Sequence, residues 1–178
     1  MQAQDSDVST PLLVLGGARS GKSSWAESVI SGFHPPYVYV ATAQALDEEM
    51  KLRIQLHRER RKGAWETVEA PLNLCEVLEQ FIGLQKPVLV DCITLWLSNK
   101  LCADSSGIEA SVERLCKTIG FVDYPLVIVS NETGAGIVPE NPLARRFRDL
   151  CGFTNQRLAA VCTSVFFIVA GLPMRLKG

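Results

Sequence analysis

The sequence lacks any apolar run long enough to cross a membrane. Its longest runs, at 11–15, 87–90 and 165–170, are far shorter than the roughly 20 residues that a membrane-spanning helix needs. The first ten residues contain no basic residue and no apolar segment, so we interpret 1–10 as a flexible tail and not as a signal or transit peptide. These absences predict a cytoplasmic protein with no transmembrane segment.

The chain also lacks an excess of positive charge and closely paired cysteines. Its 178 residues include 18 Lys and Arg against 19 Asp and Glu, which gives a net charge of -1. Nucleic-acid binding depends on basic side chains that neutralise phosphates, so we expect neither DNA nor RNA as the main partner. Six cysteines are present, but none has the C-x-x-C spacing of a zinc site. We expect free thiols, as is usual in a reducing cytosol.

The composition and the hydrophobic pattern predict one α/β domain over residues 11–178. Apolar segments of strand length alternate with helix-length periodic segments, which is typical of a mainly parallel central sheet. Most of the strand segments are continuously apolar, as expected when helices cover both faces of the sheet. The predicted strands are 12–15, 37–42, 66–69, 88–91, 126–130 and 165–170. The predicted helices are 22–31, 47–62, 73–81, 94–101, 108–121 and 142–162, the last capped by Asn141 with Pro142 at its first position.

A glycine-rich segment, GGARSGKS, follows the first predicted strand and satisfies the phosphate-loop pattern G-x-x-x-x-G-K-S/T. Its glycines let backbone N–H groups surround a phosphate, and the helix that follows turns its positive dipole end toward the anion. We expect Lys22 to lie in a solvent-accessible loop and reach the β and γ oxygens, and Ser23 to ligate Mg²⁺. The predicted nucleotide-binding residues are therefore Gly16, Gly17, Ala18, Arg19, Ser20, Gly21, Lys22 and Ser23.

Asp91 ends the apolar run VLVD and is the candidate acid of the same site. It would hold Mg²⁺ directly or through a water, and the alternative is that it only caps the helix that begins near Thr94. Thr42 and Glu132 also follow predicted strands, at the edge where open α/β sheets bind ligands, so we predict that both contact the nucleotide. Glu132 would orient a metal-bound water or accept hydrogen bonds from guanine, and the sequence favours neither role.

A histidine lies among arginines in the predicted helix 47–62. Arg53, His57 and either Arg60 or Arg61 recur at helical spacing and would share one face. That face suits a polyphosphate, because a neutral imidazole is a competent nucleophile towards phosphorus and guanidinium groups stabilise the transferred charge. The alternative is that His57 extends the apolar stripe of this helix into the core.

Two further segments are the most specific motifs of the chain: R-I-x-x-H, which ends at His57, and SNETGAGIVP at 130–139. They form one pattern with the phosphate loop and with 39–43, 47–50, 91–99, 144–149 and 155–159. This pattern resembles the bifunctional adenosylcobinamide kinase / adenosylcobinamide-phosphate guanylyltransferase family of cobalamin biosynthesis. The matching segments span nearly the whole chain after residue 11.

The resemblance implies a RecA-like P-loop NTPase fold, a homotrimer and two activities. One activity would phosphorylate adenosylcobinamide with ATP or GTP. The other would transfer GMP from GTP to adenosylcobinamide phosphate, which gives adenosylcobinamide-GDP and pyrophosphate. The resemblance also implies that His57 carries the GMP covalently.

Two other functions are compatible with the phosphate loop. A small-molecule kinase without nucleotidyl transfer would need this loop and Asp91 but not His57. A nucleotide-dependent switch or ATPase that drives a partner protein would need no acceptor site. The sequence leaves open the preferred phosphate donor, the number of nucleotide sites and the residues that contact the corrinoid.

Overall fold

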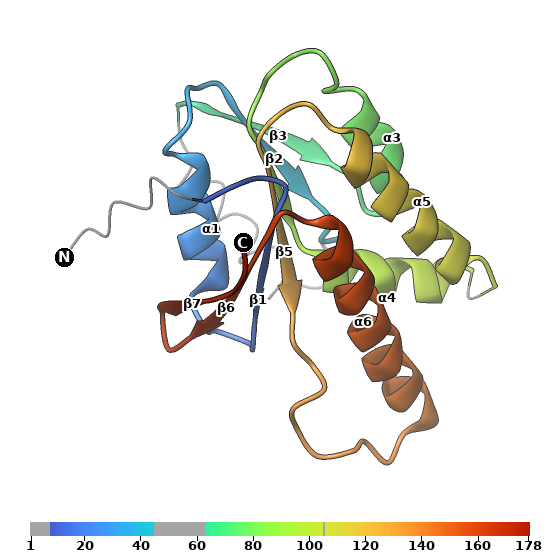
Figure 1. Cartoon of the computed structure of the whole chain (residues 1–178). Coiled ribbons are helices and arrows are strands. Elements are labelled where there is room, and N and C mark those ends of the chain that lie inside the picture. The colour runs from blue at the N-terminus through green and yellow to red at the C-terminus, as the bar shows by residue number, and fades with distance from the viewer. Residues whose placement is uncertain (1–7, 45–62, 105) are drawn as a thin grey trace.

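The computed structural model describes residues 8–44, 63–104 and 106–178. Within them, one seven-stranded sheet has the order β3-β2-β4-β5-β1-β6-β7 (Figure 1). Its strands are β1 Leu12–Gly16, β2 Tyr37–Ala41, β3 Trp65–Glu69, β4 Val88–Asp91, β5 Leu126–Asn131, β6 Ser164–Val169 and β7 Leu172–Lys177. Every neighbouring pair is parallel except β6 with β7. The prediction of a mainly parallel sheet is confirmed.

Helices cover both faces of this sheet, as predicted (Figure 1). In the described ranges they are α1 Lys22–Ile30, α3 Leu74–Glu79, α4 Ile93–Ala103, α5 Ile108–Phe121 and α6 Pro142–Val161. α1 packs on one face, and the other four pack on the opposite face. The predicted helix 47–62 and the first seven residues of the predicted tail lie outside the described residues.

Strand β1 shows why the strand segments read as continuous apolar runs. Leu13 and Leu15 belong to the core beneath the layer of four helices, whereas Leu12 and Val14 belong to the core beneath α1. All four side chains are buried. A strand that is covered on both faces needs an apolar residue at every position, and β1 therefore shows no polar alternation.

The start of α6 follows the predicted chemistry. The side chain of Asn141 accepts hydrogen bonds from the backbone N–H groups of Leu143 and Ala144, at 2.8 and 3.2 Å. Pro142 occupies the first helical position, where a missing N–H costs no hydrogen bond. These contacts begin the helix that later contributes a polar side chain to the carboxyl edge of β5.

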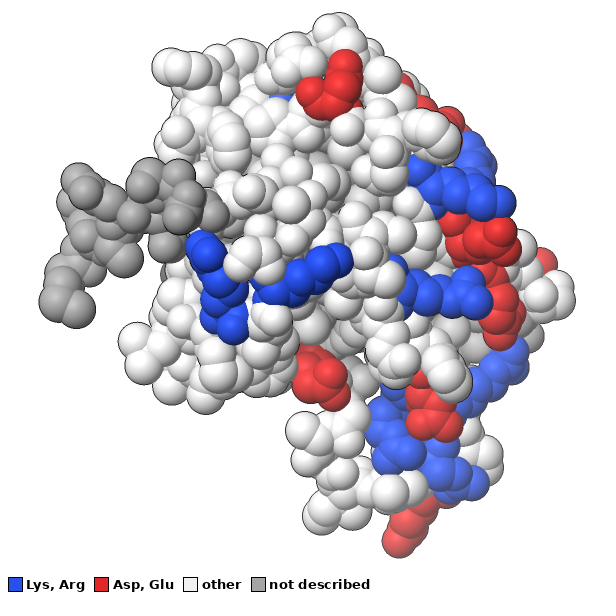
Figure 2. Space-filling view, viewed as in Figure 1, with Lys and Arg blue, Asp and Glu red and all other residues white. Residues whose placement is uncertain are grey.

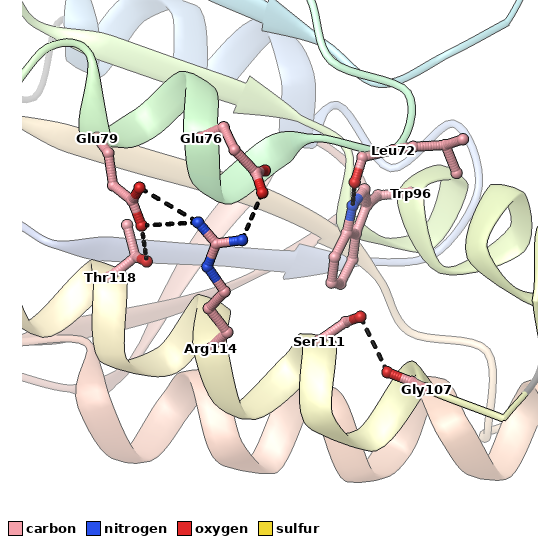
Figure 3. A network of polar contacts seen from close by, with 8 residues as sticks. All are labelled: Leu72, Glu76, Glu79, Trp96, Gly107, Ser111, Arg114 and Thr118. Atoms are coloured by element: carbon pink, nitrogen blue, oxygen red, sulfur yellow. Dashed lines mark hydrogen bonds and ion pairs between the residues drawn. The ribbon is translucent and has the colours of Figure 1, made fainter.

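An ion-pair network joins α3 to α5 on the outside of the four-helix layer. The guanidinium of Arg114 pairs with Glu76 and, at 3.2 Å, with Glu79 (Figure 3). Thr118 also donates to Glu79, at 3.3 Å. The three charged side chains of this network are about half exposed, so solvent screens each ion pair and its contribution to stability is small.

The surface charges are mixed on the face that Figure 2 displays. Figure 2 shows positive and negative side chains interleaved along the right-hand side, with no broad area of one sign.

All six cysteines lie within the described residues and are free thiols, as expected. Among the helices of the described ranges, none is both long enough and apolar enough to cross a membrane.

The sequence did not predict β7. Its residues, LPMRLK, include a proline and two basic side chains, so they form no continuous apolar run. β7 is the last strand at its side of the sheet, where the missing N–H of Pro173 removes no ladder hydrogen bond. A strand that follows an antiparallel turn at a sheet edge is thus less visible in the sequence than a buried parallel strand.

Candidate nucleotide-binding site

The predicted phosphate loop joins β1 to α1, and its two flanking glycines are required by geometry. Gly16 lies in register between Asn131 of β5 and Ile168 of β6. A Cβ atom on Gly16 would lie 2.5 Å from the hydroxyl of Ser20 and 2.8 Å from the carbonyl oxygen of Ile168. Gly21, which precedes α1, has a φ of 94°, a conformation that favours glycine.

Lys22 is the first residue of α1, and the residue is 8 % exposed. Our expectation of a solvent-accessible lysine was therefore wrong. The ammonium group donates to the carbonyl of Gly17 at 3.0 Å across the loop. Burial lowers the pKa of Lys22, and the neighbouring acidic groups of Cys92 and Asp91 act in the opposite direction. A desolvated cation favours an added negative charge, so Lys22 is suited to a phosphate.

Asp91 lies at the carboxyl end of β4, and β5 separates this strand from β1. Two strand spacings put about 10 Å between the ends of β4 and β1, which leaves room for a phosphate group or a hydrated ion. The carboxylate is partly exposed and accepts a hydrogen bond from the hydroxyl of Tyr39 at 3.1 Å. The N-cap residue of α4 is Cys92, so Asp91 does not occupy the capping position of the alternative interpretation.

Thr42 does not lie at the surface of the site. Its side chain is fully buried, and its hydroxyl donates to the carbonyl of Cys92 at 2.7 Å and accepts from the N–H of Cys92 at 2.8 Å. These bonds join the ends of β2 and β4. The predicted contact between Thr42 and the nucleotide is therefore replaced by a structural role next to Asp91.

Glu132 lies beside the phosphate loop, directly after β5. Its backbone N–H donates to the carbonyl of Gly16 at 3.0 Å. Its carboxylate is partly exposed and accepts from the N–H of Gly134 at 2.5 Å. This contact turns the carboxylate toward its own loop, at the edge of the sheet that also carries Lys22 and Asp91.

A buried polar network that the sequence analysis missed holds the end of β5. Asn155 of α6 accepts from the hydroxyl of Ser130 at 2.7 Å and donates to the carbonyl of Asn131 at 3.0 Å. The hydroxyl of Thr94 in α4 accepts from the N–H of Asn131 at 2.8 Å. These bonds fix the end of β5 between Lys22 and Asp91. The only sequence feature that indicated this network is the presence of polar residues at the end of an apolar strand.

The remaining predicted residues fall into two groups. Ala18 and Arg19 are exposed in the loop, where Arg19 has a φ of 55°, and Ser23 is partly exposed in the first turn of α1. The predicted residues of the helix 47–62 lie outside the described part of the chain; they are Arg53, His57, Arg60 and Arg61. The structure thus brings together the phosphate loop, Asp91 and Glu132.

Comparison with known proteins adds to this geometry. The family model described as cobinamide kinase / cobinamide phosphate guanyltransferase matches residues 12–176. The chain belongs to the cobinamide kinase / cobinamide phosphate guanyltransferase family. The resemblance seen in the sequence is confirmed, because the match covers the phosphate loop, the R-I-x-x-H motif and the SNETGAGIVP stretch.

Two relatives whose names describe bifunctional enzymes of adenosylcobalamin biosynthesis align with this chain along almost their whole length. The chain is 46 % identical over 167 residues to the bifunctional adenosylcobalamin biosynthesis protein CobP of Pseudomonas aeruginosa, covering 93 % of this chain and 96 % of the relative. It is 39 % identical over 180 residues to the bifunctional adenosylcobalamin biosynthesis protein CobU of Escherichia coli K12, covering 93 % and 99 %. This cobinamide kinase family member therefore aligns with nearly the full length of both relatives.

Solved structures of distant proteins share the fold. A protein of Pyrococcus horikoshii OT3 aligns with a TM-score of 0.54 and 13 % identity, covering 94 % of this chain and 85 % of that one. An ATPase from the type III secretion system of pathogenic bacteria aligns with a TM-score of 0.52 and 12 % identity, covering 92 % and 56 %. These likenesses confirm the predicted α/β fold with a mainly parallel central sheet, which this family member shares with both solved structures.

Proposed function

We propose that the chain is a bifunctional enzyme that phosphorylates adenosylcobinamide with ATP or GTP and then transfers GMP from GTP to adenosylcobinamide phosphate. The products of the second reaction are adenosylcobinamide-GDP and pyrophosphate. The observation that carries this proposal is a phosphate loop with a buried Lys22 near Asp91, in a chain of the cobinamide kinase family. Following the family resemblance, we also propose a homotrimer.

The residues of the phosphate loop account for the kinase reaction. The backbone N–H groups of the loop bind the phosphates, and Lys22 reaches the β and γ oxygens from the start of α1. The hydroxyl of adenosylcobinamide attacks the γ-phosphorus in line and loses its proton to solvent, while the bond from that phosphorus to the bridging oxygen breaks and the nucleoside diphosphate leaves. Lys22 stabilises the negative charge that moves onto the leaving group.

The donors at the carboxyl edge fit a magnesium ion. The carboxylate of Asp91 and the hydroxyl of Ser23 are hard oxygen ligands, which Mg²⁺ prefers over nitrogen and sulfur. When bound, the ion supplies positive charge to the phosphate oxygens. The hydroxyl of Tyr39 holds the Asp91 carboxylate in place at 3.1 Å, and Asp91 supplies the negative charge that a cation needs.

His57 accounts for the second reaction in this proposal. Its imidazole attacks the α-phosphorus of GTP, a P–N bond forms, and pyrophosphate leaves. A phosphate oxygen of adenosylcobinamide phosphate then attacks the same phosphorus, and the P–N bond breaks to release His57. Arg53 with Arg60 or Arg61 would stabilise the charge on the transferred group. The support for these roles is the R-I-x-x-H motif and the family match.

A labelling experiment separates this function from its rivals. GTP with a radioactive α-phosphate should label the protein, and the label should be lost in acid and kept in alkali, as a phosphoramidate behaves. A kinase without nucleotidyl transfer and a nucleotide-driven switch predict no such label. Failure to convert adenosylcobinamide into its phosphate with ATP or GTP would contradict the kinase activity directly.

Replacement of Asp91 by asparagine tests the proposed metal site. The amide keeps the shape and can still accept from Tyr39, but it lacks the negative charge, so we expect the Mg²⁺ requirement to rise about ten-fold or more. Titration of kinase activity and of nucleotide-induced thermal shift with Mg²⁺ measures this change. Asp123→Asn is the matched control. Asp123 precedes β5, at the edge of the sheet opposite the candidate site, and its carboxylate accepts a hydrogen bond from the N–H of Gly83. Unchanged titration curves for Asp91→Asn would remove Asp91 from the site.

A further inference from the structure

The turn between β6 and β7 lies against the phosphate loop (Figure 1). β6 ends at Val169 and β7 begins at Leu172, so only Ala170 and Gly171 form the turn. Their φ values are 51° and 81°. A two-residue hairpin with two positive φ values is a type I′ turn, which glycine and asparagine favour. Alanine at the first position is therefore under strain that the surrounding contacts must offset.

Two contacts join this turn to the loop. The N–H of Gly171 donates to the carbonyl of Ser20 at 2.8 Å. A Cβ atom on Gly21 would lie 3.1 Å from the Cα of Gly171, so the two backbones approach closely. The start of the loop also lies close to β6: a Cβ atom on Gly16 would lie 2.8 Å from the carbonyl oxygen of Ile168. The hairpin thus contacts both ends of the phosphate loop.

The hairpin is itself anchored, which allows it to support the loop. The ammonium of Lys177 donates to three carbonyl groups at the end of α6, those of Ala159, Ala160 and Cys162, at 2.7 to 3.0 Å. A lysine at this place satisfies carbonyl groups that have no partner within the helix and opposes the negative end of the helix dipole. β7 is therefore fixed to α6 at its far end and to the phosphate loop at its turn.

The bond to Ser20 also sets the direction of a second backbone group. The carbonyl of Ser20 and the N–H of Gly21 belong to one planar trans peptide unit, so they point in opposite directions. Because the carbonyl points toward the hairpin, the N–H of Gly21 points away from it, toward the exposed side of the loop. In the proposed function, the phosphates of the nucleotide bind the loop from this side.

We propose that Gly171 is a positioning residue for nucleotide binding, because its backbone N–H orients the Ser20–Gly21 peptide so that the Gly21 N–H is directed at a bound phosphate. This inference rests on the proposed function, in which the loop binds ATP or GTP. A donor that is already oriented before binding costs less free energy to immobilise, so the hairpin raises the affinity for nucleotide without touching it.

The first test replaces Gly171 by valine, which disfavours a φ of 81° and so moves the N–H away from Ser20. We expect the Kd for ATP and for GTP to rise about ten-fold, the usual effect of one lost hydrogen bond, while the number of binding sites per chain stays the same. Ala170→Gly is the matched control, since it keeps the N–H and tolerates a positive φ, and it should bind like the wild type. Equilibrium binding with labelled nucleotide measures both quantities.

A second test removes the N–H alone and covers the case in which Gly171→Val fails to fold. Recombinant residues 1–161 can be ligated to a synthetic peptide of residues 162–178, because Cys162 supplies the natural cysteine that ligation requires. An ester in place of the amide between Ala170 and Gly171 replaces N–H by oxygen and leaves every side chain unchanged. The comparison is with the same ligated protein made with all amides, and the expected result is again a Kd about ten-fold higher.

The outcomes separate this inference from the proposed function. If the ester protein has the same Kd as the all-amide protein, Gly171 has no positioning role. If the ester protein has fewer binding sites per chain but an unchanged Kd, the substitution has unfolded part of the sample, and this result also overturns the positioning role. Failure of the recombinant wild-type protein to bind ATP or GTP would contradict the proposed function instead.

Discussion

A protein in which alanine replaces Lys22 is expected to lose both activities, with kcat/KM for each falling about 100- to 1000-fold. Lys22 is the only lysine of the phosphate-loop motif, and its ammonium group lies at the loop, 3.0 Å from the carbonyl of Gly17. Alanine leaves the phosphates without this charge-assisted donor, both when the nucleotide binds and when charge develops on the leaving group. Both reactions use a nucleoside triphosphate, so both should fall together.

Thermal unfolding shows whether the Lys22→Ala protein is folded. Alanine removes one hydrogen bond but also relieves the burial of a cation, and these opposed effects leave the nucleotide-free Tm close to that of the wild type. MgATP should raise the Tm of the wild type and not that of Lys22→Ala. The matched control is Lys86→Ala, since Lys86 pairs with Glu66 at 3.1 Å and precedes β4, at the opposite edge of the sheet. Kinase and guanylyltransferase rates within a few-fold of wild type would remove this loop from the nucleotide site.

Replacement of His57 by alanine or asparagine is expected to separate the two activities. Guanylyl transfer and self-labelling by GTP should be abolished, because the neighbouring arginines Arg58, Arg60 and Arg61 are permanently protonated and cannot act as nucleophiles. Kinase activity should persist, since the substrate hydroxyl attacks the γ-phosphate without an enzyme nucleophile. The protein should then accumulate adenosylcobinamide phosphate and release no pyrophosphate.

Product analysis with adenosylcobinamide, ATP and GTP checks this result. One such substitution typically costs about 1 kcal/mol against a total stability of roughly 5–15 kcal/mol, so the variant should remain folded. His34, the other histidine of the chain, is exposed between α1 and β2, and His34→Ala is the control that should keep both activities. A folded His57→Ala protein that still forms adenosylcobinamide-GDP at the wild-type rate would rule out the covalent mechanism.

Much of the fold could be predicted because local pattern decides it. The predicted strand 88–91 coincides with β4, and the predicted helix 108–121 coincides with α5. Each of these segments has a clear hydrophobic pattern: β4 is a continuous apolar run up to Asp91 at its end, and α5 has a repeating apolar face. β7 was missed because its exposed, partly basic residues follow a turn whose strained Ala170 is an unusual choice for that position.

The candidate site was predictable where the chemistry is local in the sequence. Lys22 and Asp91 could be found from a motif and from the end of an apolar run. Thr42 was misjudged because its burial depends on Cys92, which is 50 residues away. The contact of Tyr39 with Asp91 spans 52 residues, and in a continuously apolar strand nothing distinguishes one tyrosine from its neighbours. Contacts between strands thus decide which polar groups at the carboxyl edge face solvent.

The central position of β1 determines when the phosphate loop can form during synthesis. β1 is the first strand to leave the ribosome, yet its two partners, β5 and β6, come from residues 126–169. Until those residues emerge, both hydrogen-bonding edges of β1 lack their native partners, and unpaired strand edges make a partly folded chain prone to aggregation. A chain that is terminated before β6 therefore carries the complete GGARSGKS sequence without the strand that shapes it. In this topology, the phosphate loop reaches its native surroundings only after the residues of β6 have been synthesised.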